Sequence, residues 1–376
     1  MARANALKLG LFALNLEHGG TVSNEPWTLP LDWQSVKRVA QLGDRLGLEL
    51  LVPVARWRGF GGETNYGGHC YDTFAWAAGL AAATENIHVW STCHVPTIHP
   101  LVAAKQLATI DHISGGRAGV NIVGGWFREE LEMFGRPMLE HDRRYELAEE
   151  WTQIVNHLWT SEEPLDFHGE FFRIDDGVSK PKPLQDPRPA FMNAGGSPRG
   201  QRFAAEYADT VFVFVADDRM EALAENVASY KEAARADFGR ELAVWTQASV
   251  VCADTDAAAH ERLAEIMRGA DYVALDNMLM QVGISGTAAS AAGVNRDMPR
   301  PLVERFVLGW GGQAMVGSPD RVAAQLQALA DAGIDGCLLV FPDWERDLQQ
   351  FGGDVLPLLE RAGLRMPSDA AAPQKI

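Results

Sequence analysis

The chain has 376 residues, of which 47% are hydrophobic and 22% charged, so it can bury one large core or two smaller ones. Its formal net charge is −17 and no Lys/Arg-rich block offsets it, which argues against nucleic acid and anionic lipid as partners. No stretch approaches the roughly 20 apolar residues of a membrane span, and the scattered cysteines are typical of reduced thiols, so we expect a cytoplasmic protein.

Short apolar runs alternate with helical patterns along almost the whole chain. Strands are predicted at 7–14, 48–55, 87–92, 118–123, 190–194, 210–215, 242–251 and 336–341. Helical spacing of apolar residues occurs at 33–46, 101–110, 200–207, 220–236, 257–268 and 321–332. The runs are continuously apolar, as expected of parallel strands buried on both faces. Eight such units predict an α/β fold, a single (β/α)8 TIM-barrel domain over residues 1–376, in preference to an open doubly wound sheet.

Two insertions and a tail depart from this repeat. Residues 160–185 contain DFHGEFFRID and predict a small hairpin after a long helix. Residues 270–312 separate the seventh and eighth units, and a connection that long in a compact barrel is usually functional, so we expect an active-site lid. A poorly ordered insertion is the alternative. Residues 366–376 are expected to form a flexible tail.

Residues that follow the predicted strands carry the candidate chemistry, because barrel enzymes act at the C-terminal ends of their strands. These positions are Asn15, 54–58, 92–94, 121–126 and 193–197, which are rich in amides, hydroxyls, glycines and tryptophans. They contain no carboxylate pair, Ser-His-Asp set or metal cluster. His88, His94 and His99 do not suggest a metal site, since His88 lies inside a strand and His99 precedes a helix. The set indicates a flat heteroaromatic cofactor that brings its own reactivity.

Two predicted helix N-termini, one at Ser197 and one at His141, suggest anion contacts. Gly195 and Gly196 precede Ser197 at a helix cap, with Pro198 in the first turn, which fits a phosphate or flavin contact or an ordinary capped turn. Gly317-Ser318-Pro319 repeats this chemistry, and capping alone explains it.

The second helix start is LEHDRRY, where His141 precedes Asp142 as a possible cap. Arg143, Arg144 and Tyr145 crowd the first turn. Cations there oppose the helix dipole, so we expect an anion nearby, with a solvated charged face as the alternative.

The stretches ATIDHISGGRAGVNIVGGW and LEHDRRYELAEEW resemble the bacterial luciferase-like, flavin-dependent monooxygenases. Two-component dimethylsulfone and pyrimidine monooxygenases are the most similar groups, and the resemblance covers nearly the whole chain. It implies the barrel, FMN delivered as FMNH2 by an NAD(P)H-dependent flavin reductase, O2 as co-substrate, and a homodimer or homotetramer. The chain has no G-x-G-x-x-G motif after a strand, which agrees with a separate reductase.

The resemblance also implies roles for individual residues. It places the flavin against Ala55, Arg56, Asn121, Glu130, Arg144, Tyr145 and Ser197. Asn121 and Thr92 match positions that border an oxygen pocket, where neutral donors stabilise developing charge and apolar walls exclude water. Their alternative role is to satisfy backbone groups at strand ends. His94, Arg56 and Trp126 are expected to handle the substrate, while Trp57, Trp126 and Trp310 shape the pocket.

The sequence does not identify a single substrate. RGFGG at 58–62 matches the pyrimidine type, whereas NIVGGWFREEL is closer to the sulfone type. Arg56 replaces a lysine of the pyrimidine enzymes, which keeps the charge but changes its geometry. We expect oxidation of a sulfone, sulfonate, pyrimidine or haloaromatic with C–S, C–N or C–halogen cleavage, through oxygen addition at flavin N5 or C4a. A deazaflavin-dependent oxidoreductase and a non-catalytic flavin-binding protein are the alternatives.

Overall fold

Parallel strands close into a barrel in the computed structural model, which describes residues 5–215, 219–281 and 298–367. The barrel strands are β1 (Lys8–Phe12), β2 (Leu50–Val52), β3 (His88–His94), β4 (Ala118–Val123), β7 (Ala190–Asn193), β8 (Thr210–Phe212), β9 (Ala243–Cys252) and β11 (Gly336–Val340). They pair in this order, and β11 pairs with β1. Each overlaps one predicted apolar run, so the TIM-barrel prediction is confirmed.

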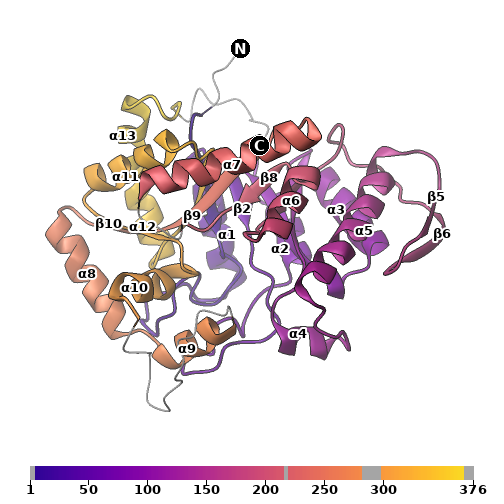
Figure 1. Ribbon diagram of the computed structural model, residues 1–376. Helices are drawn as coiled ribbons and strands as arrows, with labels where there is room; N and C mark the ends of the chain where they lie inside the picture. The colour runs from indigo at the N-terminus through magenta and orange to yellow at the C-terminus, as the bar shows by residue number, and fades with distance from the viewer. Residues whose placement is uncertain (1–4, 216–218, 282–297, 368–376) are drawn as a thin grey trace.

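Helices alternate with these strands and surround the barrel (Figure 1). They are α1 (Trp33–Arg45), α2 (Thr73–Ala81), α3 (Pro100–Ser114), α5 (His141–Thr160), α6 (Pro198–Tyr207), α7 (Met220–Phe238), α8 (Asp256–Arg268), α11 (Pro319–Asp331), α12 (Trp344–Gln350) and α13 (Leu356–Arg361). Within the described ranges, no helix has both the length and the apolar character needed to cross a bilayer.

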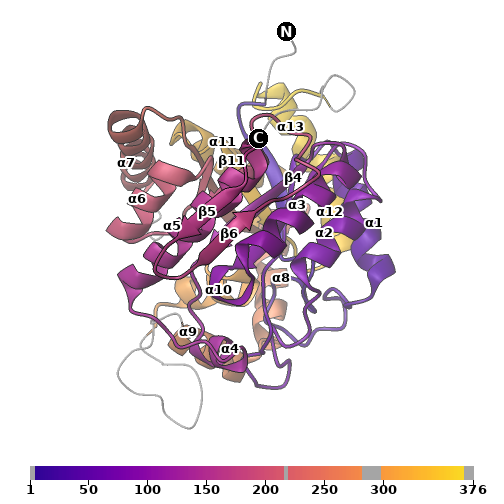
Figure 2. The same cartoon turned by 90° about the vertical axis from the view of Figure 1, so that its right-hand side faces the viewer.

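Further elements lie outside the eightfold repeat. The segment 160–185 contains an antiparallel pair, β5 (Leu165–His168) and β6 (Arg173–Gly177), which lies beside α5 (Figure 2). The segment 270–312 contains α9 (Tyr272–Gln281) and α10 (Arg300–Gly309), and residues 282–297 within it lie outside the described residues, as does most of the predicted tail. The sequence did not predict β10 (Gln313–Gly317), which extends the sheet beside β9, or the short α4 (Arg128–Met133).

The interior of the barrel is filled by large side chains that face glycines. Trp90 and Trp245 are fully buried there with Leu50, Leu338 and other apolar side chains. A Cβ atom on Gly119 would lie 2.5 Å from the Trp90 indole, and one on Gly336 would lie 2.3 Å from that of Trp245. Both glycines therefore make room for an indole, as close packing of the barrel requires.

Gly119→Ala is expected to lower the free energy of unfolding by about 1–3 kcal/mol, because the indole of Trp90 has no room to move. Gly353→Ala is the matched control, since no atom lies within 4 Å of the added Cβ. Its free energy of unfolding should stay within about 0.5 kcal/mol of the parent value. Urea unfolding followed by circular dichroism measures both. Equal losses in the two variants would contradict the steric explanation.

Candidate active site

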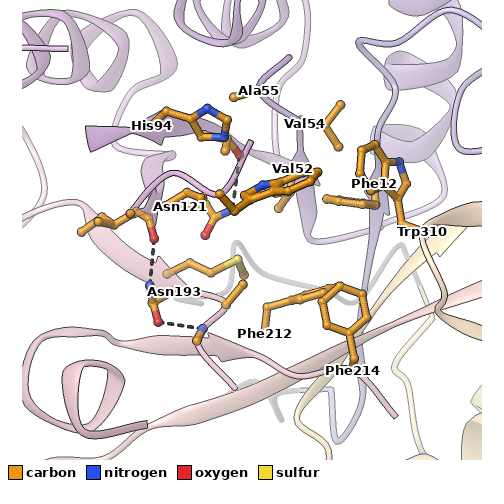
Figure 3. A pocket seen from close by; sticks show the side chains of 18 of the residues that line it. Phe12, Val52, Val54, Ala55, His94, Asn121, Asn193, Phe212, Phe214 and Trp310 are labelled. Carbon is orange, nitrogen blue, oxygen red and sulfur yellow. Dashed lines mark hydrogen bonds between the residues drawn. The ribbon is translucent and has the colours of Figure 1, made fainter. Parts of the chain in front are cut away.

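A cavity of about 720 Å³ lies at the C-terminal ends of the barrel strands, beneath α9 and α10 (Figure 3). Its size is in the usual range for a small-molecule site. Eight of the predicted site residues line it: Ala55, Arg56, Thr92, His94, Asn121, Trp126, Arg144 and Tyr145. Glu130, Gly196 and Ser197 are not among its lining residues.

Asn121 and Thr92 lie opposite each other on β4 and β3. Asn121 Nδ2 donates to Thr92 Oγ1 at 3.4 Å, and the Thr92 hydroxyl donates to the carbonyl of Pro53 at 2.5 Å. Thr92 thus satisfies a backbone group, as the alternative interpretation held. Asn121 Oδ1 is buried and accepts no hydrogen bond from any described residue. A buried acceptor without a partner is costly, so this atom fits an N–H donor on a bound molecule.

Arg56 follows β2 and is buried beside a carboxylate. Its Nη2 lies 3.2 Å from Glu130 Oε1, and both side chains are 1% exposed. The guanidinium carbon also lies 4.5, 5.1 and 4.6 Å from the ring centroids of Phe60, Trp126 and Phe127. These rings and the carboxylate compensate a charge that burial would otherwise disfavour.

Glu130, on α4, fixes the loop that carries Arg56. Its Oε1 accepts hydrogen bonds from the backbone N–H groups of Trp57 and Arg58 at 2.8 and 3.0 Å. The carboxylate therefore acts behind the cavity wall, on Arg56 and its loop. Trp57 is 48% exposed and stacks edge-on against Phe134, so the prediction that it lines the pocket is wrong.

His94 ends β3 and is buried at the cavity edge. Its Nδ1 lies 3.8 Å from Glu130 Oε2. Burial, reinforced by the positive charge of Arg56, lowers the pKa of His94 to about 3. The ring is therefore neutral at physiological pH, with one nitrogen able to accept a hydrogen bond.

The lowered pKa of His94 predicts a pH-dependent stability. An unfolded histidine titrates near 6.5, so between pH 6.5 and 3 the unfolded chain binds more protons and stability falls as the pH falls. Between pH 7.5 and 5 the parent protein should lose about 2 kcal/mol more than His94→Gln does. Urea unfolding at both values tests this, with His260→Gln, an exposed site on α8, as the control. Parallel losses in the parent and His94→Gln would refute it.

The first turn of α5 reaches the cavity, but its cap and the position of Arg143 differ from the prediction. The helix begins at His141 with Glu140 at the cap position and no side-chain cap. The predicted capping role of Asp142 is therefore wrong, and this carboxylate contacts the His141 ring at 2.7 Å. Arg144 Nη1 donates to the carbonyl of Gly125 at 2.6 Å and lines the cavity, whereas Arg143 pairs with carboxylates outside it.

Ser197 caps α6, as predicted, by accepting from the N–H of Gly200 at 3.1 Å. Burial raises the pKa of the neighbouring Tyr145 phenol, and interaction with the Ser197 side chain partly offsets this. Gly196 is exposed, and a Cβ there would have no neighbour within 4 Å. The backbone of this turn is thus open to a ligand. Ser318 occupies the cap position of α11, but its side chain makes no capping bond.

The three clustered histidines of the sequence do not share one site. His88 begins β3, and His99 Nδ1 accepts from the N–H of Leu101 at the start of α3. In the part of the chain that the structure describes, no three potential metal ligands come together.

The apolar side of the cavity contains residues that the sequence did not single out: Phe12, Val52, Met192, Phe212, Phe214, Met278, Leu302, Phe306 and Leu338. Trp310 joins them, as predicted. Phe12 and Phe212 end β1 and β8, the same relative position from which polar residues were selected. Their apolar character made them indistinguishable from core residues, although their strand-end position was a usable signal.

Comparisons with known proteins identify relatives and agree with the barrel fold. The family model described as luciferase-like monooxygenase matches residues 7–336. The FMNH(2)-dependent dimethylsulfone monooxygenase of Pseudomonas putida is 31% identical over 94% of this chain and 95% of its own. The pyrimidine monooxygenase RutA of Allorhizobium ampelinum is 32% identical over 97% of this chain and 100% of its own. A riboflavin lyase (RcaE) structure with modified FMN and riboflavin superposes with a TM-score of 0.81 at 22% identity, covering 98% of this chain and 94% of the lyase.

Proposed function

The chain belongs to the luciferase-like monooxygenase family, and we propose that it uses O2 and FMNH2 to oxidise a small organic molecule. A separate NAD(P)H-dependent reductase supplies the FMNH2, and the enzyme works as a homodimer or homotetramer. One observation carries the proposal: the buried, unpartnered Oδ1 of Asn121 on the polar side of the cavity.

The polar side of the cavity fits a reduced flavin. When bound, FMNH2 supplies the electrons that activate dioxygen. Asn121 offers an acceptor to a ring N–H, and Ala55 allows a flat ring to approach the strand ends. Arg144 and Tyr145, with the turn at Gly196 and Ser197, offer positive charge, a hydroxyl and open backbone to a phosphate.

Other residues of this chain bind polar groups and exclude water. Neutral His94 can accept a hydrogen bond at a ring nitrogen, while Arg56 stays charged against Glu130. The rings of Phe60, Trp126 and Phe127 keep water away from this side. In the segment 270–312, α9 and α10 supply Met278, Leu302 and Phe306 to the cavity, and we propose that this segment serves as its lid.

Anaerobic titration with FMNH2, followed by mixing with oxygenated buffer, tests the proposal. We expect FMNH2 to bind and its reoxidation in the complex to differ from that of the free flavin. No binding, or reoxidation identical to that in solution, would overturn the assignment. Tighter binding of a deazaflavin than of FMN would also do so. The purified chain alone should not oxidise NAD(P)H in the presence of FMN.

A further inference from the structure

Four aromatic side chains form one side of the cavity, and we call them the aromatic wall: Phe12, Phe212, Phe214 and Trp310. Figure 3 shows them together on one side, with His94, Asn121 and Asn193 on the other. Phe12 and Phe212 stack at 5.8 Å with an interplanar angle of 24°, and Phe214 meets Phe212 edge-on at 5.2 Å and 86°. Both arrangements are favoured ways for aromatic rings to meet, and a further ring can extend them.

One member of the wall is held in a condition that a ligand would improve. Phe214 is 50% exposed although it lines the cavity, so its ring gains from being covered by an apolar molecule. Trp310 ends α10 as its left-handed C-cap, with φ 52°, and lines the cavity from that position.

Hydrogen-bonding groups are scarce at the wall. Apart from the Trp310 indole, the polar side chain beside it in the described ranges is Arg305. Its Nε donates to the carbonyl of Gly312 at 3.2 Å and its Nη2 to that of Val215. A pyrimidine or a sulfone would exchange its hydrogen bonds to water for contacts with phenyl rings, which costs affinity.

We propose that the aromatic wall selects a carbocyclic aromatic compound as the substrate. The inference rests on the proposed function, because it assigns the polar side of the same cavity to the flavin. It departs from the substrates named for the relatives, dimethyl sulfone and pyrimidines, since the wall offers ring contacts where those molecules need hydrogen bonds.

Calorimetric titration of the full chain saturated with FMN tests the substrate class. The probes are 2-naphthoate, its fully saturated decahydro analogue, uracil and dimethyl sulfone. We expect 2-naphthoate to bind best, at least about threefold more tightly than the saturated analogue, which has the same carbon skeleton but no π system. Tighter binding of uracil or dimethyl sulfone would overturn the inference, as would equal affinities for 2-naphthoate and its decahydro analogue.

Substitutions test whether the aromatic wall causes the preference for an aromatic ligand. Phe214→Leu keeps an apolar side chain without a ring, and Phe214 is exposed enough for the fold to tolerate it. The preference for 2-naphthoate over its saturated analogue should fall toward one in this variant and stay unchanged in Phe171→Ala, which removes a ring beside Arg143 outside the cavity. An unchanged preference in Phe214→Leu would overturn the inference. If FMN binds and no aromatic probe does, only this inference fails; if neither FMN nor FMNH2 binds, the proposed function fails.

Discussion

Asn121→Ala is expected to slow the reaction of enzyme-bound FMNH2 with oxygen by about 100-fold, because it removes a preorganised polar group from the reacting centre. The free energy of unfolding should change by less than about 0.5 kcal/mol. The reason is that Asn121 Oδ1 has no partner among the described residues and Nδ2 makes one long contact with Thr92. Stopped-flow absorbance with enzyme in excess over flavin, so that all flavin is bound, measures the rate.

Asn193→Ala is the matched control, since it deletes the same amide one strand away. Here both ends of the amide hold the backbone: Nδ2 donates to the carbonyl of Ile122 at 2.8 Å, and Oδ1 accepts from the N–H of Gly195 at 2.8 Å. This variant should lose about 1–3 kcal/mol of stability, with a smaller effect on the oxygen rate. The proposed role of Asn121 would be wrong if both variants slowed the reaction equally, or if Asn121→Ala were the one that unfolds.

The barrel was predictable because its signal is local. A run such as 118–123 is apolar except at Asn121 and has no alternation of polar and apolar residues, which is typical of a strand buried on both faces. The segment 270–312 was not predictable in the same way. It was predicted only as a long connection, yet α9 and α10 lie within it and supply Met278 and Phe306 to the cavity.

Part of the site was also predictable from the sequence and part was not. Asn121 and His94 were found because they are polar residues at strand ends, and the ends of barrel strands converge at one rim. The aromatic wall was missed because apolar strand-end residues are also what a core requires. The action of Glu130 on the loop was missed for another reason: its carboxylate bonds to Trp57, 73 residues earlier, and no sequence periodicity reports a contact of that range.

Glu130→Ala is expected to cost about 3–5 kcal/mol of stability, because it leaves Arg56 as a buried charge without its carboxylate. It also removes the acceptor for the N–H groups of Trp57 and Arg58, so the loop after β2 should loosen and FMNH2 should bind more weakly. Urea unfolding and anaerobic titration measure the two effects. Glu170→Ala is the control, since Glu170 pairs with Arg143 at the surface and should contribute little to stability.

A second substitution separates loss of the ion pair from loss of packing. Arg56→Met, added to Glu130→Ala, removes the stranded charge while keeping apolar volume among Phe60, Trp126 and Phe127. The double variant should therefore be more stable than Glu130→Ala alone, because the cost of an unpaired buried charge disappears. FMNH2 affinity should stay low, since the loop N–H groups still lack their acceptor. Additive losses in the double variant would show that Glu130 stabilises the loop through packing and hydrogen bonds, and that the Arg56 charge needs no partner.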